Sequence, residues 1–272
     1  MEKKILFTDI DGTLLNDNRE IPRENMEAIN KALEAGHSVV IATGRPLDSG
    51  KKIVEELGLT KPGCYMIAYN GAIIYDCGQE KVLEKKFVPY EYVEELFKMG
   101  EEAGLYVQTY NKNQIITTQD TPELQYYRQH TKLGYQVVED VMAVLEEEPQ
   151  KVMLINLEDK KRLEQFQADH MEWQEGKCHS FFSMDTYLEY APMNATKAAG
   201  IHYLCDLLHV PLENTIAAGD ERNDIPMLKE AQIGVAMKNA KEEVKACADY
   251  ITERTNNESG IAEVIEKFLL NE

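Results

Sequence analysis

The chain of 272 residues is poor in positive charge. Lysine and arginine together number 29, against 48 aspartate and glutamate residues, and the formal net charge is −19. A field of that sign repels polyanions, so it argues against binding to nucleic acid or to an anionic membrane surface. An anionic small molecule can still bind where a cation or oriented dipoles reverse the field locally.

The sequence also lacks paired cysteines and long apolar runs. Its five cysteines form no CxxC pair, which argues against zinc or redox chemistry and fits a reducing cytosol. The apolar run after "MEKK" is too short for the core of a signal peptide, and no stretch approaches the roughly 20 apolar residues of a membrane span. We therefore expect a cytoplasmic protein that does not cross a membrane.

Strand-like and helix-like patterns alternate at both ends of the chain. The expected strands cover residues 3–8, 37–43, 65–75, 214–219 and 233–237, and the third breaks at the turn dipeptide Asn70-Gly71. The expected helices cover residues 21–36, 47–58, 197–208, 225–231, 239–248 and 260–269. In the first helix, Pro22 is expected in the first turn, and Met26, Ile29 and Leu33 on one face. This alternation predicts an α/β core with a parallel sheet.

The pattern changes in the middle of the chain. From about Lys85 to Glu189, helices are separated by paired strand-like runs at residues 105–110, 114–119, 151–157 and 181–190. We interpret residues 85–189 as an inserted second domain, and residues 1–84 and 190–272 as one discontinuous core domain.

Polar residues follow the expected strands of the core. They are Asp9, Asp11, Thr13, Thr43, Gly44, Arg45, Asn70, Gly71, Asp220, Asn223 and Asp224, with Lys197 at the start of a late helix. Ligands of open parallel sheets bind beyond the carboxyl ends of the strands. Neighbouring carboxylates repel each other, but a divalent cation and a bound phosphate would offset that cost, and oxygen-only ligands suit magnesium.

Each of these motifs alone has a simpler explanation. Asp-Gly after a strand is usually a turn, Lys197 alone would be a solvated surface lysine, and Asn223 with Asp224 would cap a helix. The stretch "GRPLDSGKK" is not a P-loop, because Gly44 and Gly50 are too far apart and a lysine occupies the Ser/Thr position. The joint occurrence of the motifs, in order and each at a strand end, favours a shared site.

Together these motifs resemble a known family. "DIDGTLL", "TGR", "NGA", the lysine that opens a late helix and "GDERNDIPML" resemble the signature set of the haloacid dehalogenase superfamily. More narrowly, the chain resembles the Cof-like sugar-phosphatase branch, to which "ADYITERTNNESGIAEVI" is also similar. Glu221 departs from the pattern, which more often has a small or amide residue there. This departure bears on the identity of the substrate more than on the type of reaction.

The resemblance implies a Rossmann-like parallel-sheet core with an inserted α+β cap domain. It also implies a magnesium-dependent phosphatase that acts on a small phosphorylated metabolite such as a sugar phosphate. Asp9 would be the nucleophile that forms an aspartyl-phosphate, and Asp11 would be the general acid and base.

The resemblance further implies the ligands of metal and phosphate. Asp9, the backbone carbonyl of Asp11 and Asp220 would hold Mg²⁺, with Asp224 supporting the metal directly or through water. The residues expected to bind or orient the phosphate are Thr43, Gly44, Lys197 and Asn223. Asn70 would lie near the junction with the cap.

Other functions share parts of this pattern. A phosphomutase or phosphotransferase would use the same core residues and pass the phosphoryl group to another acceptor. A non-catalytic sensor could bind a sugar phosphate and signal through movement of the cap. A dehalogenase is disfavoured, because displacement of halide needs no proton donor and leaves Asp11 without a purpose. We expect a monomer or a weak homo-oligomer.

Overall fold

The computed structural model describes residues 2–112 and 114–270, and the chain divides into two compact units. The first unit consists of Met1–Gly44, Gly50–Glu84 and Thr196–Glu272. The second consists of Lys85–Ala195 together with the short segment Arg45–Ser49.

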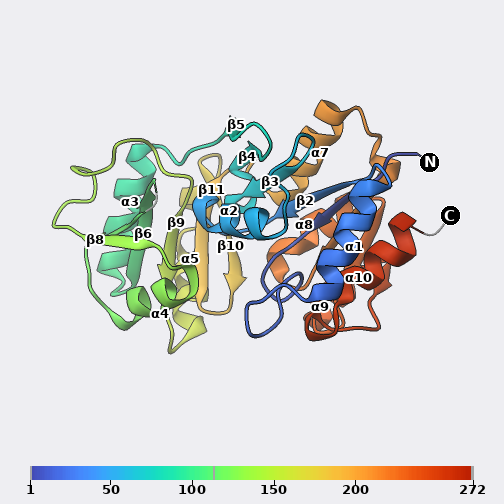
Figure 1. The fold of residues 1–272 in the computed structure, drawn as a ribbon. Helices are drawn as coiled ribbons and strands as arrows, with labels where there is room; N and C mark the ends of the chain where they lie inside the picture. Colours follow the sequence, from blue (N-terminus) through green and yellow to red (C-terminus); the bar gives the residue numbers. More distant parts are fainter. Residues whose placement is uncertain (1, 113, 271–272) are drawn as a thin grey trace. The chain divides into compact units, whose positions relative to one another are not determined.

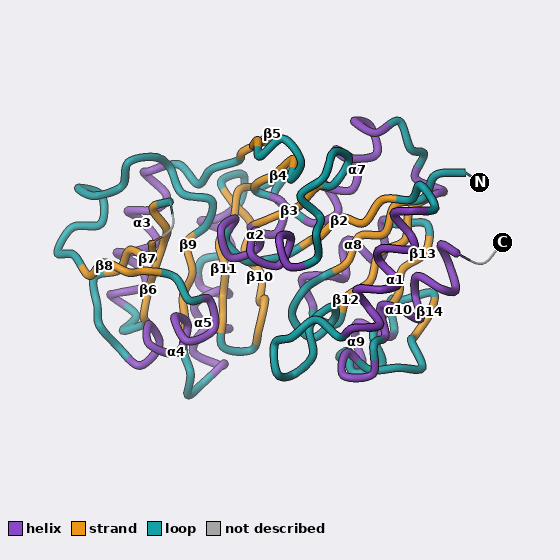
Figure 2. The backbone as a smooth tube through the Cα atoms, viewed as in Figure 1, coloured by secondary structure: helices purple, strands orange, loops and turns teal. Residues whose placement is uncertain are grey.

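An eight-stranded sheet forms the centre of the first unit (Figures 1 and 2), in the order β14-β13-β12-β1-β2-β3-β4-β5. Its strands are β1 (Ile5–Thr8), β2 (Ser38–Ala42), β3 (Tyr65–Ala68), β4 (Ile73–Asp76), β5 (Lys81–Lys85), β12 (Thr215–Gly219), β13 (Ile233–Ala236) and β14 (Tyr250–Ile251). Neighbours from β14 to β3 run parallel. Every residue of β1, β2 and β12 is buried, as is typical of parallel strands that are covered on both faces. The predicted α/β class is confirmed.

Helices of the first unit connect these strands. They are α1 (Arg23–Glu34), α2 (Leu47–Glu56), α7 (Lys197–Leu208), α8 (Ile225–Glu230), α9 (Glu242–Lys245) and α10 (Gly260–Ile265), with short 3₁₀ turns η1 (Tyr69–Gly71), η2 (Leu212–Asn214), η3 (Arg222–Asp224) and η4 (Asn256–Glu258) and a final π turn η5 (Glu266–Leu270). Helix α2 begins in the segment that groups with the second unit. Figure 1 shows α1 and α10 side by side.

The buried face of α1 differs from the predicted one. Ile29 is buried as expected, but Met26 and Leu33 are only half-buried. Asn25 takes a fully buried place, because its Nδ2 donates to Leu14 O at 3.2 Å and its Oδ1 accepts from the Ala262 amide at 2.9 Å. A polar side chain that is satisfied on both sides thus shifts the buried stripe.

Several boundaries also differ. The strand expected over residues 65–75 breaks at Asn70-Gly71 as predicted, but its two parts form a hairpin of β3 and antiparallel β4, because Asn70 (φ 54°) and Gly71 (φ 107°) reverse the chain. The expected helix over residues 239–248 shortens to α9. Pro22 is the N-cap of α1 and does not lie in its first turn. Three short strands at sheet edges, β5, β8 and β14, were not predicted.

The second unit contains a six-stranded sheet in the order β10-β11-β9-β6-β7-β8. Its strands are β6 (Tyr106–Asn111), β7 (Gln114–Thr117), β8 (Gly134–Val137), β9 (Val152–Ile155), β10 (Cys178–Met184) and β11 (Tyr187–Pro192). Its helices are α3 (Tyr90–Glu102), α4 (Pro122–Thr131), α5 (Lys160–Asp169) and α6 (Met171–Gln174). All neighbouring strands are antiparallel except β7 and β8. Apolar side chains of α3 and α5 pack on one face of this sheet with those of β6, β9 and β11.

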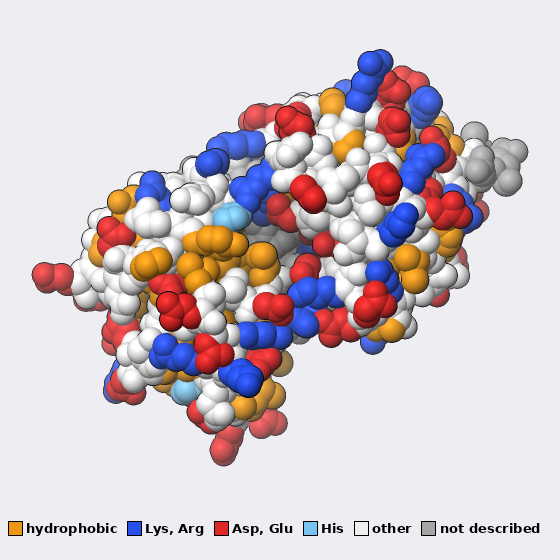
Figure 3. Space-filling view, turned by 90° about the horizontal axis from the view of Figure 1, so that it is seen from below, with side chains coloured by type: hydrophobic (Ala, Val, Ile, Leu, Met, Phe, Trp, Pro, Cys, Tyr) orange, Lys and Arg blue, Asp and Glu red, His pale blue; other side chains and the backbone are white. Residues whose placement is uncertain are grey.

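Charged side chains of both signs are intermingled on the molecular face seen in Figure 3. Among the residues that the structure describes, none of the helices has both the length and the apolar character needed to cross a membrane.

A buried ion pair lies within the second unit. Lys151 Nζ lies 2.9 Å from Glu189 Oε2, and the two side chains are only 2% and 3% exposed. The Ser183 hydroxyl donates to the other oxygen of Glu189 at 2.5 Å. Such a pair contributes little net stability compared with apolar residues, but removing one partner leaves a charge buried without compensation.

We therefore expect Lys151→Met to lower the free energy of unfolding by about 3–5 kcal/mol. The double variant Lys151→Met/Glu189→Leu should recover most of that loss. Lys112→Met is a matched control, because Lys112 pairs with Glu146 on the surface and its loss should cost no more than about 1 kcal/mol. Urea unfolding measures all three. An equal cost for the two single variants would contradict the assignment of an uncompensated buried charge.

Candidate active site

The two aspartates of "DID" lie directly beyond β1. The Asp9 amide donates to Ala218 O at 3.0 Å, so the backbone still follows β12 at this point. The Asp9 side chain is buried, whereas Asp11 is exposed. The two carboxylates therefore stand in different surroundings although one residue separates them.

Lys197, from the later part of the sequence, contacts Asp9. It is the first residue of α7, whose N-cap Thr196 accepts a hydrogen bond from the Ala199 amide through its side chain. Lys197 Nζ donates to Asp9 Oδ1 and to Asp224 Oδ1, each at 2.5 Å, and its side chain is 0% exposed. A lysine buried in this way needs its carboxylate partners, so the interpretation as a solvated surface lysine is wrong.

Asp224 organises the loop after β12. Its Oδ2 accepts hydrogen bonds from the amides of Asp220 and Glu221, each at 3.0 Å, while its Oδ1 accepts from Lys197. Both oxygens of this carboxylate therefore have protein donors. Asp224 ties the Asp220 backbone to the lysine.

Asp220 is held against the first loop. Thr13 Oγ1 donates to Asp220 Oδ1 at 2.6 Å. Gly12 has φ 76°, and a Cβ atom there would lie 2.3 Å from Asp220 Oδ2. Only glycine permits both the left-handed turn and this close approach.

Three carboxylates form a cluster that could hold a metal ion. One oxygen from each of Asp9, Asp220 and Asp224 lies within 4.8 Å of the others. Burial raises the pKa of Asp9 to about 7; Lys197 counteracts this shift, and Asp224 and Asp11 add to it. Burial, with Asp9 and Asp224, raises the pKa of Asp220 well above its usual value.

Lys197 itself is held as a cation. Burial opposes its charge, but Asp224 and Asp9 outweigh that cost and raise its pKa. One lysine faces several carboxylates, so the cluster carries excess negative charge that a divalent cation would offset.

The remaining predicted residues meet around the η1 turn. Thr43 is buried, and its amide and carbonyl bond to Ile67 O (2.8 Å) and to the Asn70 amide (2.9 Å). Asn223 Nδ2 donates to Asn70 Oδ1 at 3.0 Å. A Cβ atom on Gly44 would lie 2.9 Å from Asn70 Nδ2. The link between Asn70 and Asn223 was not predicted, since it depends on the left-handed backbone of Asn70.

Glu221, the departure from the family pattern, is bound within its own loop. Its side chain accepts from the Arg222 amide at 3.3 Å and caps η3. Its Oε1 lies 3.1 Å from Lys241 Nζ. Lys241 therefore offsets the additional negative charge beside Asp220.

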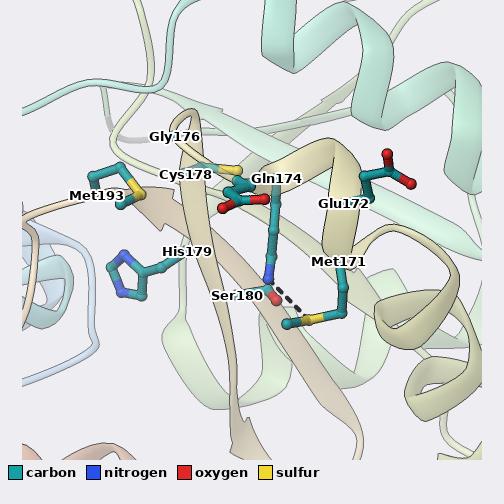
Figure 4. Close-up of a pocket in the computed structure, with 9 residues that line it drawn as sticks. Met171, Glu172, Gln174, Gly176, Cys178, His179, Ser180 and Met193 are labelled. Carbon is teal, nitrogen blue, oxygen red and sulfur yellow. Dashed lines mark hydrogen bonds between the residues drawn. The ribbon is translucent and has the colours of Figure 1, made fainter.

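A separate cavity of about 490 Å³ lies within the second unit (Figure 4). Its lining residues are Met171, Glu172, Gln174, Glu175, Gly176, Cys178, His179, Ser180 and Met193. Within residues 2–112 and 114–270, no lysine or arginine lines it, and Glu172 and Glu175 would repel a phosphate. The predicted site residues do not line it, and we assign it no part in phosphate chemistry.

Comparison with known proteins places the chain in a family. The model of the haloacid dehalogenase-like hydrolases matches residues 6–265. A 5-amino-6-(5-phospho-D-ribitylamino)uracil phosphatase of Bacillus subtilis, YcsE, is 32% identical, over 98% of this chain and 96% of its own length.

Solved structures agree with this result. A haloacid dehalogenase-like hydrolase from Bacteroides thetaiotaomicron has a TM-score of 0.89 at 31% identity, over 98% of this chain and 99% of the other. A sugar phosphatase of subclass IIB of the superfamily has a TM-score of 0.82 at 27% identity, over 97% and 98% of the two chains. With the match over nearly its whole length, the chain belongs to the haloacid dehalogenase-like hydrolases, in their Cof-like branch, and is a phosphatase.

Proposed function

We propose that this phosphatase hydrolyses a small sugar phosphate in a magnesium-dependent reaction, with Asp9 as its nucleophile. The observation that carries the proposal is the buried Lys197 ammonium between Asp9 and Asp224, next to Asp220. In a chain of net charge −19, this arrangement supplies a fixed cation where a phosphate would meet a carboxylate.

Asp9 would attack phosphorus and form an aspartyl-phosphate. Lys197 donates to Asp9 and so fixes the carboxylate orientation. In the transition state, the same ammonium would stabilise charge on the transferring phosphoryl oxygens, together with groups of Thr43 and Gly44. Asn223, fixed by Asn70, would orient the phosphate.

Asp11 would carry the proton. Its carboxyl group is exposed, in contrast to that of Asp9, so it can reach a leaving oxygen and later a water molecule. It would protonate the departing alkoxide in the first step and activate water in the second.

The carboxylates of Asp9 and Asp220 and the backbone carbonyl of Asp11 would hold Mg²⁺, because the donor set consists only of oxygens and has excess negative charge. When bound, the ion would neutralise charge as Asp9 approaches a phosphate dianion. Both oxygens of Asp224 already accept protein hydrogen bonds, so we place it outside the direct ligands, contacting the metal through water.

The substrate class is inferred from relatives. One is named for a phosphorylated ribityl compound and another as a sugar phosphatase, and both names describe phosphate on a polyhydroxylated carbon chain. We propose that residues 85–189 act as a cap domain that recognises the part of the substrate beyond the phosphate.

A panel of phosphorylated metabolites, including sugar phosphates, ribityl phosphates and p-nitrophenyl phosphate, tests the function. We expect release of inorganic phosphate that stops after exhaustive chelation and returns when Mg²⁺ is added. Full activity after chelation would contradict the metal assignment. Transfer of the phosphoryl group to an added sugar phosphate, with no free phosphate, would favour the phosphomutase or phosphotransferase alternative.

The roles of the two aspartates can be separated with p-nitrophenyl phosphate. Asp9→Asn should be nearly inactive on every substrate. Asp11→Asn should still phosphorylate Asp9, since p-nitrophenol has a pKa of about 7 and leaves without a proton donor. Hydrolysis of the intermediate should be slow, so labelled phosphoenzyme should accumulate in an acid quench. Label on Asp11 in an active Asp9→Asn variant would reverse the assignment.

The buried charge of Asp9 gives a test of metal-free stability. The unfolded chain releases this proton near pH 3.8, whereas the folded protein keeps it to about pH 7. Raising the pH across that window therefore favours unfolding. In the presence of chelator, the free energy of unfolding of the wild-type protein should fall as the pH rises through this window. In Asp9→Asn this fall should be smaller, by up to about 1.4 kcal/mol per pH unit. Urea titrations at several pH values measure this, and identical slopes for both proteins would disprove it.

A further inference from the structure

The stretch "TNNESG", residues 255–260, takes no part in the chemistry above, yet it contacts the loop that carries Asp11. Asn256 is buried, with an exposed fraction of 3%. Its Nδ2 donates to Leu15 O at 3.0 Å and to Asp17 Oδ1 at 3.1 Å. One side chain thus holds the far end of the loop after β1.

Leu15 transmits that contact to the aspartates. The amides of Leu14 and Leu15 both donate to Ile10 O, at 3.1 and 2.9 Å. Ile10 lies between Asp9 and Asp11, and its carbonyl belongs to the peptide group that leads into Asp11. A fixed Leu15 therefore fixes the backbone immediately before Asp11.

Asn239 holds the other side of the same turn. Its Nδ2 donates to Gly12 O at 2.7 Å, and its Oδ1 accepts from the Asn256 amide at 2.9 Å. The Gly12 carbonyl belongs to the peptide group between Gly12 and Thr13, so Asn239 fixes the backbone one residue after Asp11. The two asparagines are hydrogen-bonded to each other and together hold both sides of Asp11.

We propose that Asn239 and Asn256 are positioning residues that set the direction of the Asp11 carboxyl group toward the leaving oxygen. This inference rests on the proposed role of Asp11 as general acid. Asp11 is exposed and precedes a glycine in the left-handed region, and the hydrogen bonds of Asn256 and Asn239 hold the backbone on either side of it. A displacement of about 1 Å in a reacting group can cost about 10²-fold in rate.

The predicted consequence depends on the leaving group. In Asn256→Ala and Asn239→Ala, we expect the first step to slow by about tenfold or more for the best alkyl phosphate of the panel. The first step with p-nitrophenyl phosphate should change by no more than about twofold, because nitrophenolate needs no proton. Since Asp11 also activates water, p-nitrophenolate should appear as a burst equal to the enzyme concentration, followed by a slow steady rate.

Stopped-flow release of p-nitrophenolate and rapid-quench assays with the alkyl phosphate measure both steps. Asn257→Ala is the matched control, because Asn257 contacts Asp17 and does not bond to Gly12 or Leu15. It should keep the wild-type ratio of the two rates. Asn239 is exposed, so Asn239→Ala should fold even if Asn256→Ala does not.

An equal loss on both substrates, in step with a lower folded fraction, would show that the two asparagines only stabilise the fold and would overturn the inference. The same holds if Asn257→Ala shows the same burst. If the wild-type protein releases no phosphate from any member of the panel, the proposed function fails first, and the positioning role fails with it.

Discussion

The site depends on one buried ammonium group. Lys197 has no exposed side-chain surface, and it is stable there only because Asp9 and Asp224 both accept its hydrogen bonds. These three residues come from the start of α7, the end of β1 and the η3 turn, which are far apart in the sequence. Because burying the lysine without its partners would be costly, the three segments must keep the relative positions that let Asp9 and Asp224 contact it. Removing Lys197 would leave the carboxylates of Asp9 and Asp224 without compensation in the interior.

The parallel sheet brings these three segments together. β1 lies between β2 and β12, so the residues that follow these strands emerge at the same edge. Burial at this edge, with the charge that gathers there, raises the pKa values of Asp9 and Asp220, and the excess negative charge explains why an oxygen-coordinated divalent cation fits. Carboxylates this close together require a fixed backbone around them. Gly12 lets the chain pass Asp220 at close range, and Thr13, Asn239 and Asn256 then hold the loop in place.

The second unit is stabilised mainly by packing of apolar side chains. Its mostly antiparallel sheet packs an apolar face against α3 and α5, while a satisfied polar pair, Lys151 and Glu189, is buried in the same unit. Glu172 and Glu175 are among the residues that line its cavity, and no lysine or arginine of the described residues does. These features suit contact with uncharged parts of a ligand better than they suit phosphate.

The sequence alone predicted the parallel core and the set of residues that gather at its edge, because apolar periodicity and turn residues are local properties. Asp9, Asp11, Lys197, Asp220 and Asp224 could be named from the ends of expected strands and helices. Tertiary structure decided what depends on distant partners. Asn25 is buried because Leu14 and Ala262 satisfy it, Asp224 uses both oxygens within the protein, and Glu221 is neutralised by Lys241. The contacts of Asn239 and Asn256 with the first loop join residues more than two hundred positions apart, and no local pattern encodes such a contact.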